Sequence, residues 1–124
     1  MPGAEEMPNY MPYCYEVFET MLEIKSRIEI TKLVHLISFE DNIKAILLYL
    51  WWNGIRGFIN DRRIEIDDEV SVMTIKIPIT YEKDVDIEPV IKRIQGMVGG
   101  IYTAIDSVSV GSPKLVSYPN CCAI

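Results

Sequence analysis

The apolar residues of this chain change their spacing several times, and the order of these changes restricts the fold more than any other feature. From Ile87 to Val98 they recur at helical intervals, and Gly99-Gly100 ends the pattern. From Ile101 to Val110 apolar and polar residues alternate instead, which is typical of a half-buried strand. We therefore expect a helix over 87–98 and a strand over 101–110.

A hairpin is predicted before this helix. Residues 62–67 alternate between apolar and charged side chains, and the run 70–80 places a second set of apolar residues on one face. The acidic pair Asp67-Asp68 separates the two segments and suits a short polar turn. Pro78 has no N–H to donate, so we expect its end of the strand to lie at a sheet edge or a bulge.

A strand and a helix are predicted before the hairpin. Residues Ile28–Ile37 are rich in β-branched side chains and favour a strand. Ser38 begins a Ser-x-x-Asp pattern that is typical of a helix N-terminus, and Asn53-Gly54 supplies a stop signal. The inner stripe of this helix is predicted to contain Ile43, Ile46, Leu47, Leu50 and Trp51. From Ala45 onward the helix is apolar nearly all round, which predicts deep burial or a second covered face.

Residues 13–26 fit two patterns. Tyr13, Val17, Met21 and Ile24 fall on one helical face, and Pro12 suits a first helical turn, so we favour a helix here. The same residues also alternate with period two, and a strand remains the alternative.

The order from Ile28 is strand, helix, strand, strand, helix, strand. This order predicts an α+β protein with a ferredoxin-like βαββαβ arrangement, in which two helices cover one face of a four-stranded antiparallel sheet. An N-terminal helix and a C-terminal tail would be added to it. We expect an irregular arm over residues 1–12, a single α+β domain over 13–112 and a tail over 113–124, within a length that suits one domain.

Charge and composition exclude several classes of protein. The net charge of −6 argues against binding of duplex DNA, and no apolar run reaches the roughly 18–20 residues of a membrane span. The N-terminus lacks the pattern of a secretory signal, so we expect a cytoplasmic protein. Nineteen isoleucines and a single glutamine suggest a thermophilic source, archaeal or viral.

No constellation of catalytic or metal-binding residues emerges. His35 is the only histidine, and we interpret it as a structural residue on a strand. Three cysteines, Cys14 and the adjacent Cys121 and Cys122, do not have the paired spacing of a zinc site, and we expect free thiols. We therefore expect no enzyme activity, no cofactor and no metal. No motif identifies a family, and the fold alone does not assign a function.

The apolar surplus of the central helix, and a second sheet face that also leans apolar, favour association. We expect a non-catalytic association module, a homodimer or a subunit of a larger assembly, which binds itself or another protein. One alternative is single-stranded nucleic-acid binding through aromatic and arginine side chains on a sheet face. A further alternative is a regulatory domain that senses a small ligand. The candidate binding residues, for an interface or for a single strand, are Trp51, Trp52, Arg56, Phe58, Arg62 and Arg63.

Overall fold

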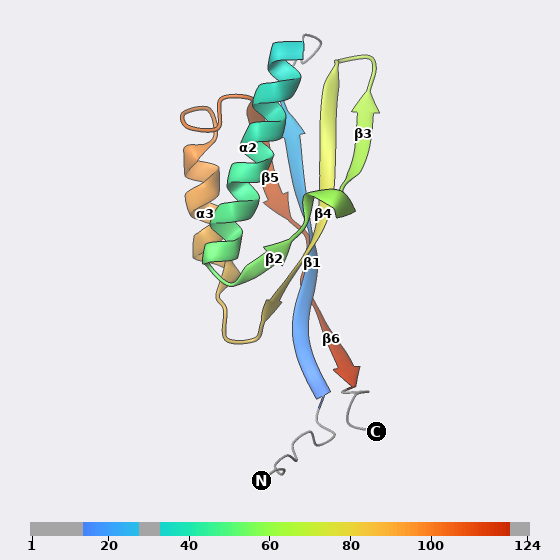
Figure 1. The fold of residues 1–124 in the computed structure, drawn as a ribbon, viewed down its shortest axis with the longest axis vertical. Coiled ribbons are helices and arrows are strands. Elements are labelled where there is room, and N and C mark those ends of the chain that lie inside the picture. Colours follow the sequence, from blue (N-terminus) through green and yellow to red (C-terminus); the bar gives the residue numbers. More distant parts are fainter. Residues whose placement is uncertain (1–13, 28–32, 120–124) are drawn as a thin grey trace.

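The computed structural model describes residues 14–27 and 33–119, which form an α+β structure with a six-stranded antiparallel sheet and two helices (Figure 1). In chain order the elements are β1 (Cys14–Ser26), α2 (Leu33–Trp52), β2 (Ile55–Gly57), the 3-10 turn η2 (Ile59–Asp61), β3 (Arg63–Asp67), β4 (Val72–Glu82), α3 (Ile87–Met97), β5 (Ile105–Val110) and β6 (Lys114–Pro119).

Two long strands, β1 and β4, form the centre of the sheet. They pair antiparallel over their whole overlap, from Val17 opposite Glu82 to Lys25 opposite Thr74. β2 and β3 both pair with β4, and β5 and β6 both pair with β1, so each outer position of the sheet is divided between two short strands. The sheet therefore has the order β2-β4-β1-β5, with β3 continuing beside β4 and β6 continuing beside β1.

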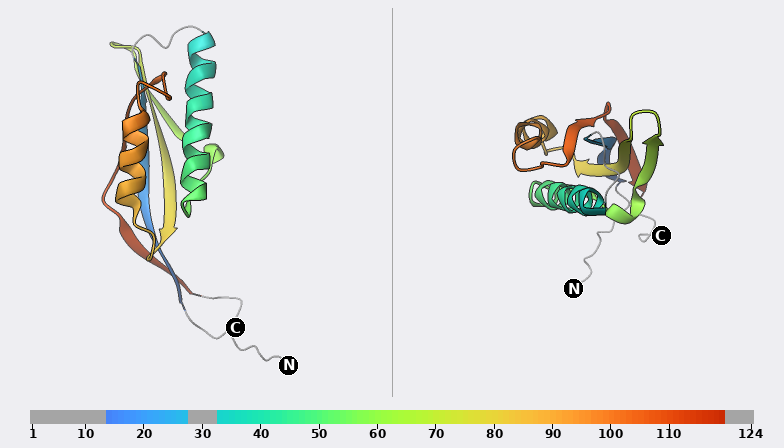
Figure 2. Two further views of the ribbon diagram at one scale, coloured as in Figure 1. Left: turned by 90° about the vertical axis from the view of Figure 1, so that its left-hand side faces the viewer. Right: turned by 90° about the horizontal axis from the view of Figure 1, so that it is seen from above.

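One face of the sheet carries the core. Leu22 lies opposite Ile77 and Ile24 lies opposite Ile75, and residues directly opposite each other share a face. All four side chains are almost fully buried. Figure 2 shows both helices on the same side of β1 and β4, where they cover this face.

The two helices bury complementary stripes. α3 begins at the N-cap Asp86, whose side chain accepts a hydrogen bond from the Glu88 amide, and it is the more amphipathic of the two described helices. The buried residues of the helices are Phe39, Ile43, Ile46, Leu47 and Leu50 on α2, and Ile87, Val90, Ile91 and Ile94 on α3. Together with the sheet residues they form a single core.

The opposite face of the sheet is the more polar one. Between the buried positions of β1 lie Glu19, Glu23 and Lys25, and the matching positions of β4 include Lys76 and Thr80. Val17 and Met21 share this face, so it is mixed rather than uniformly polar. Most of the exposed large apolar residues lie on α2 and around β3, and Ile101 and Leu115 lie elsewhere.

Two sequence predictions near the N-terminus are wrong. The favoured helix over 13–26 is strand β1 from Cys14 onward, as the period-two alternative predicted. The expected strand Ile28–Ile37 lies partly outside the described residues, and its remainder, from Leu33, is the beginning of α2. Ser38 consequently lies inside the helix and does not cap it, because the helix begins five residues earlier.

Other elements follow the sequence closely. The predicted hairpin is confirmed as β3 and β4, and the predicted helix over 87–98 is confirmed as α3. Gly54 follows the end of α2 and has a φ of +80°, as expected for a glycine that stops a helix. Pro78 lies within the central strand β4, but at the gap between the β3 and β2 ladders, where that side of β4 has no described partner. Residues 114–119 of the predicted tail form β6, so the sheet extends beyond residue 112.

Candidate functional site

Helix α2 has two apolar faces, of which only one is buried. Its inner face packs against the sheet, and Ile43, Ile46 and Leu50 have no exposed surface. On the outer face, Leu48 is 53% exposed and Trp52 is 75% exposed. In both views of Figure 2, α2 lies at the outside of the molecule, so no described element covers this outer face.

The C-terminal end of α2 presents an aromatic residue to an arginine. Trp51 is 54% exposed, and the guanidinium carbon of Arg56 lies 5.5 Å from the centre of its ring. This is the geometry of a cation–π contact, which fixes both side chains on the surface. A cavity of about 440 Å³ adjoins the pair, and Asp84 and Glu82 also line it. The site at this end of α2 is therefore aromatic but not basic.

A groove separates the first half of α2 from the β3–β4 hairpin. Its volume is about 470 Å³. It is lined by Leu36 and Phe39 from the helix, and by Ile64 and Met73 from the hairpin, among others. The groove exists because β3 extends beyond the part of the sheet that α2 covers, so Ile64 on its inner face remains 51% exposed.

The two arginines of the hairpin do not act together. Arg62 donates a hydrogen bond from Nη1 to the Ile59 carbonyl, and the same nitrogen lies 3.6 Å from Glu40 Oε2. Arg63 is the first residue of β3 and lies opposite Lys76, on the polar face of the sheet. Arg62 precedes β3 and lines the groove beside α2, so the two guanidinium groups serve different surfaces.

The structure thus divides the six predicted site residues among several places. Trp51 and Arg56 are in contact, Arg62 lines the groove, and Arg63 lies on the polar face. Phe58 follows β2 and is 58% exposed. The placement of Trp51 on the inner stripe of the helix is wrong, because the buried face ends at Leu50 and Trp51 turns outward.

The apolar residues of the outer face that precede the tryptophans were not predicted from the sequence. Ile37 and Leu48 are each 53% exposed on α2. Leu48 lies in the apolar run from Ala45 to Trp52, whose excess was noted but not assigned to residues. Ile37 could not be found this way, since its segment was assigned to a strand.

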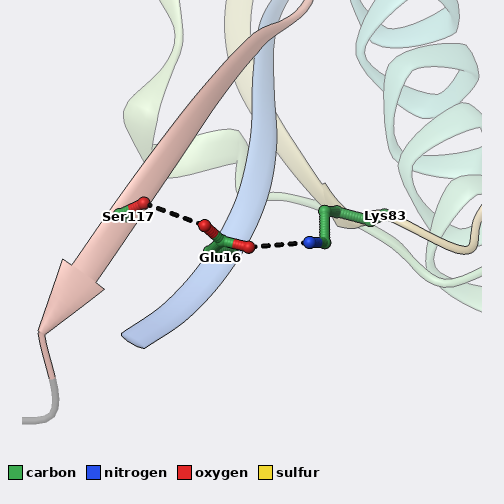
Figure 3. A network of polar contacts seen from close by, with 3 residues as sticks. All are labelled: Glu16, Lys83 and Ser117. Atoms are coloured by element: carbon green, nitrogen blue, oxygen red, sulfur yellow. Dashed lines mark hydrogen bonds and ion pairs between the residues drawn. The ribbon is translucent and has the colours of Figure 1, made fainter. Parts of the chain in front are cut away.

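A polar network joins three elements at the far end of the sheet (Figure 3). Glu16 on β1 accepts a 2.7 Å hydrogen bond from Lys83 Nζ and a 3.3 Å hydrogen bond from Ser117 Oγ on β6. The hydrogen bond and the positive charge of Lys83 hold the pKa of Glu16 below its usual value. Burial raises the pKa of two tyrosines, Tyr81 and Tyr102, above the usual value. The Glu16 network links β1 to β6 and to the turn that follows β4.

His35 is exposed on α2 and does not lie on a strand. In the described part of the chain, no three His, Cys, Asp or Glu side chains come close enough together to hold a metal ion. Cys121 and Cys122 lie outside the described residues. Neither described helix combines the length and the apolar character needed to cross a bilayer.

Comparison of this chain with protein-family models, with curated proteins and with solved structures gave no match. The geometry of α2 and its surroundings is therefore the basis for a functional assignment.

Proposed function

We propose that this protein is a non-catalytic association module, a homodimer or a subunit of a larger assembly, and that the outer face of α2 is its contact surface. The observation that carries the proposal is the exposure of Leu48, Trp51 and Trp52 on one side of a helix whose other side is fully packed. Tryptophan is enriched among the residues that dominate binding energy at protein interfaces.

The size of this surface supports the proposal. If each of these large side chains offers roughly 150–250 Å², the exposed fractions of Trp51, Trp52, Leu48 and Ile37 together expose roughly 350–590 Å², and a standard interface uses about 800 Å² per partner. The largest apolar patch on a typical monomer measures about 300–600 Å² and is often functional. A partner that packs on α2 would remove it from water.

Single-stranded nucleic acid is the second candidate, and one observation favours it. The Trp51 ring and the Arg56 guanidinium lie together beside the exposed Trp52, and such groups can stack on bases. The neighbouring acidic side chains Glu82 and Asp84, together with the net charge of −6, oppose a phosphate backbone. We therefore favour a protein partner.

For the fold, we propose a ferredoxin-like βαββαβ arrangement with both edge strands divided. In this interpretation β2 and β3 together make one edge strand, and β5 and β6 together make the other. The order β2-β4-β1-β5 and the position of one helix after β1 and one after β4 support it. β1 then takes the place of the first strand that was expected at Ile28.

The association is tested with matched leucine substitutions. Leu48→Glu places a charge on the outer face of α2, and Leu115→Glu makes the same change at a site of similar exposure on β6, far from α2. Sedimentation at about 10–100 µM, on the order of the concentrations at which weak complexes form, measures the association. We expect Leu48→Glu to abolish it and Leu115→Glu to leave it intact. Equal behaviour of the two variants would refute the surface.

The two tryptophans give an independent reading, because both belong to the proposed surface and the chain has no others. Burial of Trp51 and Trp52 should shift the fluorescence emission to shorter wavelength as the protein concentration rises. Titration with labelled single-stranded oligonucleotide at two salt concentrations tests the second candidate. Binding that weakens steeply with salt, with no change of emission on concentration alone, would reverse the preference.

A further inference from the structure

We infer that the partner on α2 is a second copy of this chain, bound through an antiparallel α2–α2 contact about a two-fold axis that passes between Asn42 and Ile43. This inference rests on the proposed function, since it names the occupant of the same helix face. It follows from the spacing, the charge and the symmetry of the exposed residues.

The outer face of α2 has the spacing of a helix-packing seam. Ile37, Asp41, Lys44, Leu48 and Trp51 are all exposed, and they follow one another at intervals of four, three, four and three residues. An average repeat of 3.5 residues keeps one line of side chains facing a partner helix, whereas the packing of a helix on a sheet does not require it. The line is apolar at its ends and charged at its middle.

The same line is complementary to itself when it is reversed. Across an axis between Asn42 and Ile43, Ile37 of one copy meets Leu48 of the other, and Asp41 meets Lys44. Each contact occurs twice, because a two-fold axis repeats every pair. Apolar residues thus meet apolar residues, and each carboxylate meets an ammonium group.

A parallel arrangement or a shift of one turn loses this match. In a parallel pair Asp41 would face Asp41 and Lys44 would face Lys44, so that like charges meet at the centre of the contact. A charged pair within a seam specifies register and orientation in this way, at some cost in stability. Neither Asp41 nor Lys44 forms an ion pair within the described residues, so both are available to a second copy.

Electrostatics make such a local match necessary for self-association. Each copy carries a net charge of −6, so two copies repel each other at a distance. The contact region must supply apolar burial and opposite charges to overcome this repulsion. The outer face of α2 offers both, whereas the exposed face of the sheet carries Glu19 and Glu23, which add to the repulsion.

The decisive experiment exchanges the central charges. Asp41→Lys gives a chain with lysine at both positions, and Lys44→Asp gives a chain with aspartate at both. We expect each variant alone to dimerise about tenfold more weakly than the natural chain or worse, because like charges face each other across the axis. We expect an equimolar mixture of the two to form a heterodimer, in which every lysine faces an aspartate. Lys92→Asp on the exposed surface of α3 is the matched charge control and should dimerise normally.

Zero-length carbodiimide cross-linking of the mixture reports the register. A bond between Lys44 of the first variant and Asp41 of the second joins two chains by necessity, because neither variant contains both natural residues. Recovery of this cross-link from the mixture, with helix content unchanged in circular dichroism, supports the antiparallel seam.

The outcomes separate this inference from the proposed function. If Leu48→Glu abolishes association but the single charge variants dimerise normally, or the mixture gains nothing, the surface is right and the antiparallel self-contact is wrong. The inference fails if the natural chain is monomeric at about 100 µM, because even weak specific complexes form at concentrations of this order. The association module would then require a different partner on the same face.

Discussion

Replacing Gly57 with alanine should destabilise this protein, whereas the same replacement at Gly96 should stabilise it. A Cβ atom at Gly57 would lie 2.8 Å from Ile79 Cγ2, well inside the 3.5–4.0 Å at which carbon atoms attract, and 3.4 Å from Leu47 Cδ2, which is close to ordinary contact. Ile79 is fully buried, and its Cγ2 is bonded directly to Cβ, so it cannot move aside without a shift of β4 or a change of rotamer. At Gly96, in the exposed part of α3, the new atom would meet nothing within 4 Å.

The expected magnitudes follow from these contacts. Overpacking a core costs about 1–3 kcal/mol, and the reduced entropy of the unfolded chain returns about 0.4–1 kcal/mol. Gly57→Ala should therefore lower the free energy of unfolding by about 1–2 kcal/mol. Gly96→Ala should raise it by about 0.5–1 kcal/mol, since alanine is the better helix former.

Urea unfolding at one fixed protein concentration measures both variants, and fixing the concentration keeps any contribution from association constant. The difference between them should reach about 2 kcal/mol, which corresponds to a difference in Tm of roughly 8 °C or more for a domain of this size. If both substitutions shift stability in the same direction by similar amounts, the close approach of β2, β4 and α2 at Gly57 is wrong.

Two further predictions concern pH. Glu16 has a lowered pKa in the fold, so its contribution to stability is present above the pKa of the unfolded chain and is lost as the pH falls through the folded value. After correction for the intrinsic pH dependence of amide exchange, the protection of β6 amides should fall selectively below about pH 4, near the ordinary carboxyl pKa, and Glu16→Gln should remove this loss. Tyr81 and Tyr102 have raised pKa values, so their contribution is complete below about pH 10, the ordinary tyrosine value, and is lost as the pH rises through the folded values. Absorbance at alkaline pH should show a group of tyrosines that ionises late, and simultaneous ionisation of all seven before unfolding would contradict the burial of these two.

The sequence predicted the second half of the fold well because its elements have unambiguous spacing. α3 buries Val90, Ile91 and Ile94 on one stripe, and the hairpin strand β4 alternates cleanly from Ile75 to Tyr81. Each of these elements has one covered face and one exposed face. Periodicity is most informative in that situation.

The first half failed where an element has apolar residues on more than one side. β1 is central, with strands on both flanks, and it buries Val17 on one face but Leu22 and Ile24 on the other. Because the buried apolar residues change from one face to the other, Val17, Met21 and Ile24 follow one another at intervals of four and three residues, as they would on a helix. At Leu33–Ile37 the β-branched residues favoured a strand, but packing of the whole of α2 outweighs the small local propensity of its first turn.

The sequence predicted the candidate site in part, and the part that it did not predict depends on the direction in which each side chain of α2 points. Composition and the apolar run from Ala45 identified the tryptophans of α2, but not the side of the helix to which each of them points. Trp51 and Leu47 differ by about one turn, yet Leu47 is packed and Trp51 is half exposed. A step of four residues turns the side chain by about 40° around the helix, which carries Trp51 away from the buried stripe that includes Leu50.

The divided edge strands affect how this chain behaves at high concentration. An uninterrupted outer strand offers a row of free amide and carbonyl groups on which further chains can assemble without limit. Here both outer positions are split into strands of three to six residues, and β3 carries Arg63, Glu65 and Asp67 along its length. Such edges are poor templates for open-ended fibre growth. In this way a protein in which nearly half of the residues are hydrophobic can keep an exposed apolar helix face, and the two-fold contact that we propose for that face would close after a single partner.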